Sequence, residues 1–133
     1  MTGLNQTVLD VAASLDDEHV AATSIDQNKI QLFRTKTTTR IEQYSGHSDL
    51  VTSVRFNYNQ KSLISASNDR TIRTWNIATG QHTTAQCPSR INNIDLSWSE
   101  TIMVSTHLKD MRFWNVSSGT AQVIHTLKNA HRD

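Results

Sequence analysis

The sequence predicts an all-β protein assembled from repeated units of short strands, and three observations lead to this prediction. Some stretches alternate apolar and polar side chains with the two-residue period of a strand, as in 51–56. Turn-forming residues, for example 57–60 and 68–70, separate these stretches. The same order of features recurs at a spacing of about 40 residues, which is typical of repeat architectures.

The clearest unit runs from Gly46 to Gly80 and contains three predicted strands. The first is the alternating stretch 51–56, and the second, 63–67, consists of small and apolar residues that suit a crowded interior. Asn68-Asp69-Arg70 favours a tight hairpin, because Asn and Asp tolerate unusual backbone angles. The third strand spans 71–77 and contains Trp75, after which Thr79-Gly80 turns the chain again.

This unit resembles a WD40 repeat, which forms a four-stranded blade of a β-propeller and carries a Gly-His to Trp-Asp signature. Gly46-His47 and Trp75-Asn76 stand at the two ends of that signature. The resemblance implies a structural tetrad of His47, Ser65, Asp69 and Trp75. An indole N–H can only donate, a hydroxyl and a neutral imidazole donate and accept, and a carboxylate accepts. The four groups can therefore be buried together without an unsatisfied partner.

His47, Ser65 and Asp69 could instead form a hydrolase triad, which is the alternative of a different functional class. The tetrad is favoured because Trp75 and the repeat spacing account for all three residues at once. A general base must also reach its substrate, whereas tetrad residues are enclosed by packing. The expectation is therefore a protein that is not an enzyme and has no catalytic residues.

A similar unit precedes this one. The apolar pattern of 46–54 occurs 43 positions earlier, at 3–11. Thr23 is expected at the hydroxyl position of the tetrad, and Phe33 stands where the Trp stands. Leu4 replaces the His, so packing alone is expected to hold this blade together.

A third unit follows and has lost the Gly-His pair, in whose place stands Cys87-Pro88-Ser89-Arg90. The first strand of this unit follows that of the clearest unit by 40 positions, but Trp114 follows Trp75 by 39, so one residue is missing from a turn between them. His107 is expected in an irregular turn with a structural role. Asp110 lies near the position of the tetrad Asp but out of register.

These repeats divide the 133 residues into a partial propeller. The expected limits are about 3–45 for blade 1, 46–87 for blade 2 and 88–129 for blade 3, and 130–133 announce a further blade. Three blades cannot close a ring, since propellers have typically about four to eight. Either further sequence of a longer protein or the association of copies is expected to complete it, and the first alternative is favoured.

Composition excludes several classes of function. A net charge of +1 gives no reason to expect binding to nucleic acid or to anionic membranes. The single cysteine, Cys87, excludes an internal disulfide and a zinc site built from cysteines, and the six His are scattered, so no metal and no cofactor are expected. No stretch is long and apolar enough to span a membrane, and Met1-Thr2-Gly3 begins no secretory signal, so a cytoplasmic location is expected.

Residues 92–115 are similar to an unusual blade of one WD40 family, the autophagy scaffold whose N-terminal half recruits a ubiquitin-like conjugate. That blade also lacks the Gly-His and carries Ser-x-His before Arg-Phe-Trp-Asp, as Ser105-Thr106-His107 and 112–115 do here. The preceding blade of that family has Asp-Arg-Thr before its third strand, like 69–71. Asn76 and Asn115 depart from the usual Asp, and the turn before Trp114 is one residue shorter. The resemblance implies a scaffold in autophagosome formation, with an adaptor subunit of another multiprotein complex as the alternative.

WD40 propellers resemble rigid discs whose loops bind peptides and other proteins. The loops expected on the binding face here are 45–50, 68–71, 87–92 and 107–110. The candidate partner-binding residues on these loops are Asn68, Arg70, Arg90, Asn92 and Lys109. Acidic or phosphorylated peptide motifs suit such a surface, because Arg forms bidentate charge-assisted hydrogen bonds. The alternative is that these residues are ordinary solvated loop charges.

Overall fold

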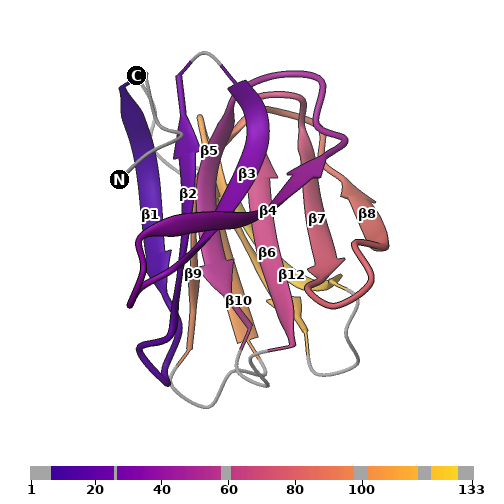
Figure 1. Cartoon of the computed structure of the whole chain (residues 1–133). Helices are drawn as coiled ribbons and strands as arrows, with labels where there is room; N and C mark the ends of the chain where they lie inside the picture. Colours follow the sequence, from indigo (N-terminus) through magenta and orange to yellow (C-terminus); the bar gives the residue numbers. More distant parts are fainter. Residues whose placement is uncertain (1–6, 26, 58–60, 98–101, 117–120, 129–133) are drawn as a thin grey trace.

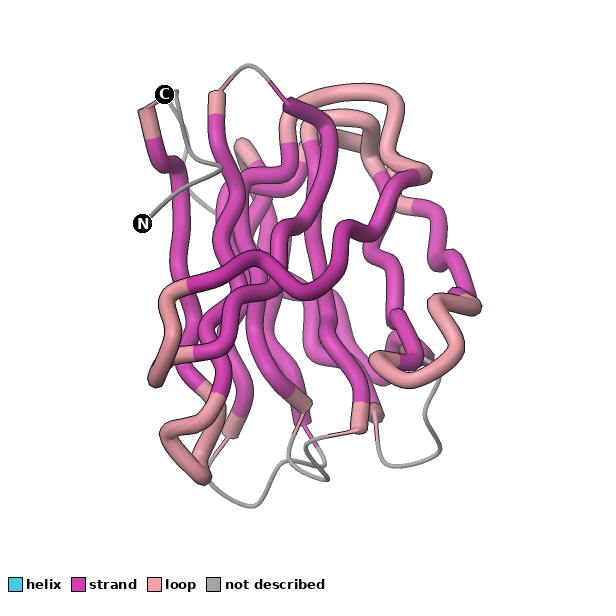
Figure 2. Tube along the Cα trace, in the orientation of Figure 1, coloured by secondary structure: helices cyan, strands magenta, loops and turns pink. Residues whose placement is uncertain are grey.

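The computed structural model describes residues 7–25, 27–57, 61–97, 102–116 and 121–128. Within these ranges the chain forms β-strands joined by turns (Figures 1 and 2), and no helix is long and apolar enough to cross a membrane. The predicted all-β class is confirmed. The first residues of blade 1, at 3–6, and the start of a further blade, at 130–133, lie outside the described residues.

The described strands form three four-stranded antiparallel sheets, none of them closed into a ring. The first sheet consists of β1 (Val8–Ala13), β2 (His19–Ser24), β3 (Gln27–Arg34) and β4 (Thr39–Ser45). The second consists of β5 (Val51–Phe56), β6 (Ser62–Ser67), β7 (Thr71–Asn76) and β8 (His82–Gln86). The third consists of β9 (Ile91–Leu96), β10 (Ile102–His107), β11 (Asp110–Asn115) and β12 (Gln122–Lys128). Each strand pairs with its neighbour in sequence, so every sheet is a meander.

Burial follows strand position within the sheets. All six residues of β6 are buried, which explains why this strand is built from small and apolar side chains. The outer strands β4, β8 and β12 are mostly exposed. Their polar side chains, such as those of Thr39, Thr83 and Gln122, suit a free sheet edge.

Two hydrophobic clusters hold the three sheets together. The first cluster joins the first and second sheets through Ile30, Leu32, Tyr44, Val54, Leu63 and Trp75. The second cluster joins the second and third sheets through Ile64, Ile72, Ile91, Met103 and Trp114. At the inner edge, β1 packs against β5 and β5 packs against β9. The middle sheet is therefore covered on both faces.

Polar side chains on the first strand of one sheet also bind the backbone of the next. Asp10 Oδ2 accepts the backbone N–H of Val54 at 3.0 Å and the Arg55 guanidinium at 2.7 Å. One sheet further on, Ser53 Oγ accepts the backbone N–H of Ile94 at 3.3 Å. Asp10 and Ser53 hold equivalent places in their sheets. Each follows a register shift, after which Asp10 pairs with Thr23 and Ser53 pairs with Ala66. These bonds satisfy N–H groups that the edge strand leaves unpaired.

Strand register corrects one expectation about the first sheet. Thr23 pairs with Ile30 in the way that Ala66 pairs with Ile72, so Thr23 is equivalent to Ala66. The position of Ser65 is taken instead by Ala22, since Val11 pairs with Ala22 as Val54 pairs with Ser65. The expectation was wrong by one residue, and a one-residue slip moves a strand side chain to the opposite face. The fully buried Thr23 hydroxyl has no hydrogen-bond partner among the described residues.

We predict that Asp10→Ala lowers the free energy of unfolding by about 1–3 kcal/mol, because it orphans the Val54 N–H inside the interface between two sheets. Asp95→Ala is the matched control. Asp95 approaches Arg55 only to 3.9 Å, its side chain is 82% exposed, and its removal should change stability by less than about 0.5 kcal/mol. Urea unfolding of the two variants measures both values, and equal effects would contradict the role of Asp10.

Candidate interaction site on the loops of the second sheet

The four predicted tetrad residues lie in one hydrogen-bonded chain. The indole N–H of Trp75 donates to Ser65 Oγ at 2.8 Å, and Ser65 Oγ lies 2.6 Å from His47 Nε2. His47 Nδ1 lies 2.9 Å from Asp69 Oδ2. Because the hydroxyl accepts from the indole, its own hydrogen is donated to His47 Nε2, and the imidazole carries its proton on Nδ1 toward Asp69. Every donor in the chain therefore has an acceptor.

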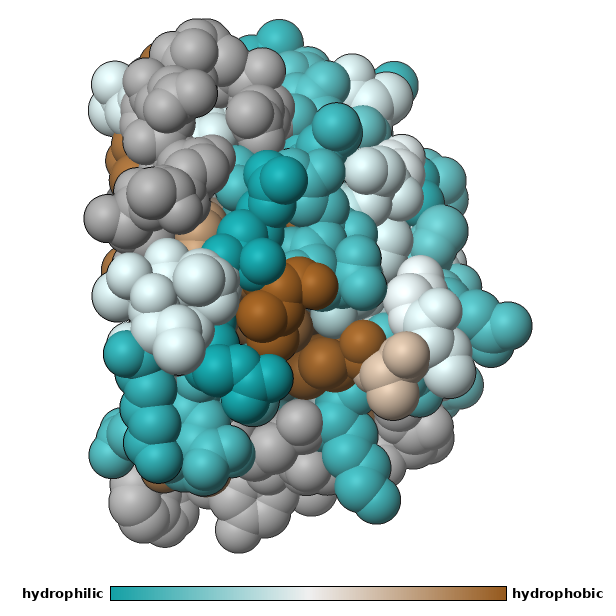
Figure 3. All heavy atoms as spheres, viewed as in Figure 1, coloured by the Kyte–Doolittle hydropathy of each residue, from teal (hydrophilic) through white to brown (hydrophobic). Residues whose placement is uncertain are grey.

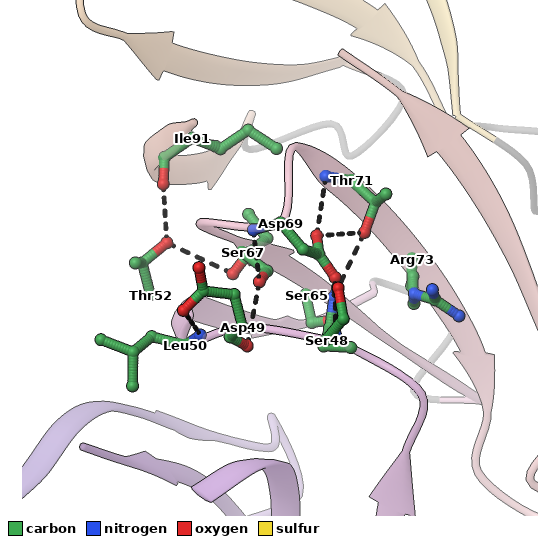
Figure 4. Close-up of polar contacts among 12 residues, drawn as sticks. Ser48, Asp49, Leu50, Thr52, Ser65, Ser67, Asp69, Thr71, Arg73 and Ile91 are labelled. Atoms are coloured by element: carbon green, nitrogen blue, oxygen red, sulfur yellow. Dashed lines mark hydrogen bonds and ion pairs between the residues drawn. The ribbon is translucent and has the colours of Figure 1, made fainter. Parts of the chain in front are cut away.

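Asp69 extends this chain into the two loops at one end of the sheet (Figure 4). It accepts the backbone N–H of Ser48 at 3.0 Å, and the backbone N–H and hydroxyl of Thr71 at 2.9 and 2.6 Å. Ser67 Oγ in turn accepts the N–H of Asp69 at 3.0 Å and donates to the carbonyl of Asp49 at 3.1 Å. The loop before β5 and the β6–β7 hairpin are thus tied to each other and to the buried indole.

The glycine that precedes His47 lies at a close approach to two side chains. A Cβ atom at Gly46 would lie 3.0 Å from Arg73 Nη1 and 3.0 Å from Trp75 Cη2. Arg73 also donates to His82 Nε2 at 2.7 Å, and the His82 ring contacts Trp75 at a tilt of 40° with a centroid separation of 4.6 Å. A side chain at Gly46 would therefore displace this cluster on the face of the indole.

Burial and hydrogen bonding shift the titration of the tetrad. Burial lowers the pKa of His47, although the hydrogen bond to Asp69 acts in the opposite direction. Burial alone would raise the pKa of Asp69, but hydrogen bonds from Thr71, His47 and the Ser48 N–H outweigh burial and lower it. The resting pair at neutral pH is thus a neutral imidazole and a carboxylate.

This geometry suits a brace rather than a hydrolase triad. Ser65 is fully buried, and its hydroxyl already accepts the indole N–H of Trp75. The side chain of His47 is 1% exposed. A nucleophile and its general base must both reach a substrate. The hydrolase alternative therefore lacks the access that its chemistry needs.

A polar depression of about 470 Å³ lies over the braced loops. Its lining consists of Ser48, Asp49, Asn68, Asp69, Arg70 and Arg90. Among the described residues, neither Arg70 nor Arg90 forms an ion pair with a carboxylate. The structure thus brings three of the five candidate partner-binding residues to one depression.

The backbone of Arg70 adopts a conformation that non-glycine residues seldom take. Its φ is +69°, in the left-handed region where a Cβ atom is strained. Hydrogen bonds hold it there, from its own N–H to the Ser67 carbonyl at 3.2 Å and from the Cys87 N–H to its carbonyl at 2.8 Å. The side chain of Arg70 is exposed. Strained residues of this kind concentrate at functional sites.

The other two candidate residues lie elsewhere. Asn92 is an exposed residue of β9, and Lys109 is exposed in the β10–β11 turn. Neither lines the depression. The sequence places all five residues on predicted loops and could not separate these two from the others. Which of them line one depression depends on how the loops of two neighbouring sheets meet.

The third sheet contains a second buried chain that the sequence reasoning missed. Trp114 Nε1 donates to Ser105 Oγ at 2.8 Å, and Ser105 Oγ lies 3.0 Å from His107 Nε2. His107 Nδ1 lies 3.3 Å from Ser89 Oγ. The expectation of a turn at His107 was wrong, because His107 is the buried last residue of β10. The signal was the Ser-x-His spacing, which places both side chains on one face of a strand.

Asp110, the candidate for an out-of-register tetrad carboxylate, begins β11 at the position that Thr71 has in β7. Its Oδ1 lies 3.8 Å from Arg112 Nε. Burial lowers the pKa of His107, although the charge of Asp110 acts in the opposite direction. The imidazole of this second chain is therefore also neutral at neutral pH.

A grouping of possible metal ligands occurs at the β1–β2 turn, in Asp16, Glu18 and His19. Asp16 already accepts the Ser14 hydroxyl at 2.5 Å and the Glu18 N–H at 2.9 Å. The hydrogen bond from Ser14 lowers the pKa of Asp16. These bonds explain the arrangement as a turn closed by an aspartate.

Comparison with known proteins adds to this geometry. Residues 38–76 match the family described as WD domain, G-beta repeat. The chain contains a WD40 repeat. The match begins just before β4 and ends with β7, so the WD40 repeat takes one strand from the first sheet and three from the second. Proteins with WD40 repeats act as interaction scaffolds and are typically not enzymes.

Several proteins are similar to the chain over most of its length. It is 31% identical over 115 residues to the periodic tryptophan protein 2 homolog of Neurospora crassa, covering 84% of the chain and 13% of that protein. It is 31% identical over 122 residues to protein tipD of Dictyostelium discoideum, covering 90% and 20%. It is 39% identical over 85 residues to nuclear distribution protein nudF of Emericella nidulans, covering 63% and 17%. The chain spans a fifth or less of the length of these relatives.

We predict that His47→Ala lowers the free energy of unfolding by about 1–3 kcal/mol, because the Ser65 hydroxyl and the Asp69 carboxylate each lose a buried partner. His125→Ala is the control, since His125 is exposed on β12, and its removal should change stability by less than about 0.5 kcal/mol. Urea unfolding gives both values. A His47→Ala variant as stable as the parent chain would remove the bracing role of the tetrad.

We also predict that the chain loses stability as the pH falls from 7.5 to 5.5. Both buried imidazoles have a folded-state pKa below the ordinary value of 6.5. The unfolded chain therefore takes up protons in this range that the folded chain does not, and stability falls. Urea midpoints across the range test this. The pH dependence should be weaker in His47→Ala, and stability that rises toward pH 5.5 would contradict the prediction.

Proposed function

We propose that this chain is a non-enzymatic interaction scaffold that binds short acidic or phosphorylated peptide motifs at the polar depression on the second sheet. The observation that carries the proposal is a pair of guanidinium groups, Arg70 and Arg90, that form no ion pair within the described ranges and line one depression of about 470 Å³. Guanidinium groups form bidentate hydrogen bonds with carboxylate and phosphate groups. The lining also contains two carboxylates, of which Asp49 accepts the N–H of Leu50 and neither forms an ion pair with these arginines. An acidic side chain of a partner would supply the anion with which Arg70 and Arg90 pair.

The tetrad supports the proposal because it makes the depression rigid before a partner arrives. Asp69 and Ser67 tie both loops to the buried Trp75. A binding surface that is already ordered loses less conformational entropy when a partner binds. The buried carboxylate of Asp69 does not compete for the arginines, since its oxygens are taken by His47, Ser48 and Thr71.

A place in autophagosome formation, in the cytoplasm, is the more specific form of this proposal. It rests on the similarity of 92–115 to a blade of the autophagy scaffold, and in particular on Ser105-Thr106-His107, which places His107 in the buried chain of the third sheet. The relatives carry names as different as periodic tryptophan protein and nuclear distribution protein. An adaptor subunit of another multiprotein complex is therefore the second candidate.

The test is binding to an array of short peptides rich in Asp, Glu or phosphoserine, followed by a titration with the tightest binder. We predict that Arg70→Glu combined with Arg90→Glu weakens this binder about tenfold or more, because charge-assisted hydrogen bonds contribute roughly 1.5–3 kcal/mol. Arg34→Glu combined with Lys36→Glu, an equal charge change at two exposed residues at and just after the end of β3, is the matched control and should have little effect.

Arg70→Gly separates binding from folding. Glycine adopts a φ of +69° without strain, so this variant should be at least as stable as the parent chain and should still bind more weakly. Parent-like binding by Arg70→Gly and by the double variant would exclude the depression as the peptide site. Weaker binding of the control variant by the same factor would show that only overall charge matters.

A further inference from the structure

The interface between the first two sheets is repeated between the second and third. Asp10 accepts the N–H of Val54, and Ser53 accepts the N–H of Ile94 in the equivalent place. Thr52, next to Ser53, donates its hydroxyl to the carbonyl of Ile91 at 2.8 Å. In both interfaces one face of a sheet packs against the opposite face of the next sheet. Such an interface is heterologous, so each sheet carries two different and complementary faces.

The third sheet has one of these faces free. Thr106 pairs with Met111 and Met111 pairs with Leu127. In the second sheet, Ala66 pairs with Ile72 and Ile72 with Ala85, and these three residues pack in the cluster that covers the third sheet. Met111 is 38% exposed and Leu127 is 47% exposed. The free face therefore presents apolar side chains where the second sheet uses apolar side chains to bind its neighbour.

The first sheet has the complementary face free. Val11 holds the position of Val54, which is buried against the first sheet. Val8 and Val11 are 41% and 55% exposed, and apolar atoms show at the margin of the molecule where Figure 1 places β1 (Figure 3). The free face of the first sheet thus carries valines at the positions where the second sheet packs valines against the first.

The polar part of the interface is also in place at both ends. Asn92 and Asn93 are exposed at the positions of Thr52 and Ser53. By the same register, the N–H of Val11 is equivalent to those of Val54 and Ile94, and no side chain among the described residues accepts it. Asn93 Oδ1 now accepts the N–H of Ile94, which Ser53 also accepts. If Asn93 turned to another acceptor role, Ile94 would stay paired with Ser53, but the buried Ser53 hydroxyl would give up its present bond of 2.9 Å to Asn93 Oδ1.

We propose that the free face of the third sheet binds the free face of the first sheet in a second copy of this chain, head to tail. Asn93 accepts the N–H of Val11 in the other copy, and the Asn92 amide donates to the carbonyl of Val8. Met111 and Leu127 pack against Val11. Two copies with three described sheets each bring six sheets together. Closed propellers have about four to eight. Both ends of each copy are then covered in one closed ring.

The first test is the mass of the chain in solution, measured by light scattering at about 10–100 µM, a range chosen for typical transient association. The proposal expects a single species of twice the chain mass of 15.0 kDa. Two outcomes overturn it. A chain that stays monomeric shows that these faces do not bind each other, and their natural cover is then another part of a longer protein. A broad distribution of larger species shows that they bind without specificity.

The second test distinguishes head-to-tail association from pairing of like faces. Val11→Glu blocks the face of the first sheet, and Met111→Glu blocks the face of the third. Each variant alone should be monomeric, since both interfaces of the ring are lost. An equimolar mixture should regain a species of twice the chain mass, because one unblocked face of each kind remains. Leu108→Glu, at a residue that is 81% exposed in the β10–β11 turn, is the control and should stay dimeric.

Circular dichroism of each variant shows whether its strands are retained, and the changed positions are exposed, so the fold should survive. If the mixture stays monomeric while both variants are folded, the head-to-tail arrangement is wrong. If one variant alone remains dimeric, the contact joins like faces and the proposal is likewise overturned. Neither outcome depends on the peptide depression, so this proposal and the proposed function are tested separately.

Discussion

The indole N–H of Trp75 must find an acceptor in a place that water cannot reach, and much of the second sheet is arranged around this need. Trp75 is 1% exposed, and its neighbours in the first core cluster are apolar. An unpaired donor there would cost about 1–3 kcal/mol. Ser65 supplies the acceptor, its hydroxyl needs an acceptor in turn, and His47 and Asp69 continue the chain to the loops. The need of the buried indole for an acceptor therefore also holds the surface loops that contain His47 and Asp69 in place.

The third sheet meets the same requirement with different residues. The indole of Trp114 also donates to a serine hydroxyl, but the imidazole comes from His107 in the same strand rather than from a loop. The chain ends on Ser89 instead of a carboxylate. In the first sheet the need disappears, because Phe33 has no donor and Ala22 stands at the serine position. Phenylalanine and alanine thus occur together in the sheet that has no indole donor to satisfy.

A second constraint acts between the sheets. The first strand of each sheet is an edge strand, and its outward N–H groups need acceptors. Asp10 and Ser53 provide them across two successive interfaces. The register shift in β1 and β5 turns these side chains toward the next sheet, which is a known use of β-bulges. Apolar packing and polar bonding thus repeat with the same period, and the loops of neighbouring sheets meet at a fixed distance. The depression that contains Arg70 and Arg90 depends on that alignment.

Local sequence determined the strands and their pairing into meanders, because strand alternation and turn chemistry depend on nearby residues. The tetrad was implied by the resemblance of 46–80 to a WD40 repeat, and its four residues do lie in one hydrogen-bonded chain. The sheet register, the second chain through His107 and the separation of Asn92 and Lys109 from the arginine pair were decided only in the folded chain. Thr23 illustrates the reason: moving the register by one residue reverses which face a side chain occupies, and packing against the neighbouring sheet selects that register. Contacts between sheets join residues about 40 positions apart, as Ser53 and Asn93 do, and no local pattern records which of their side chains will meet.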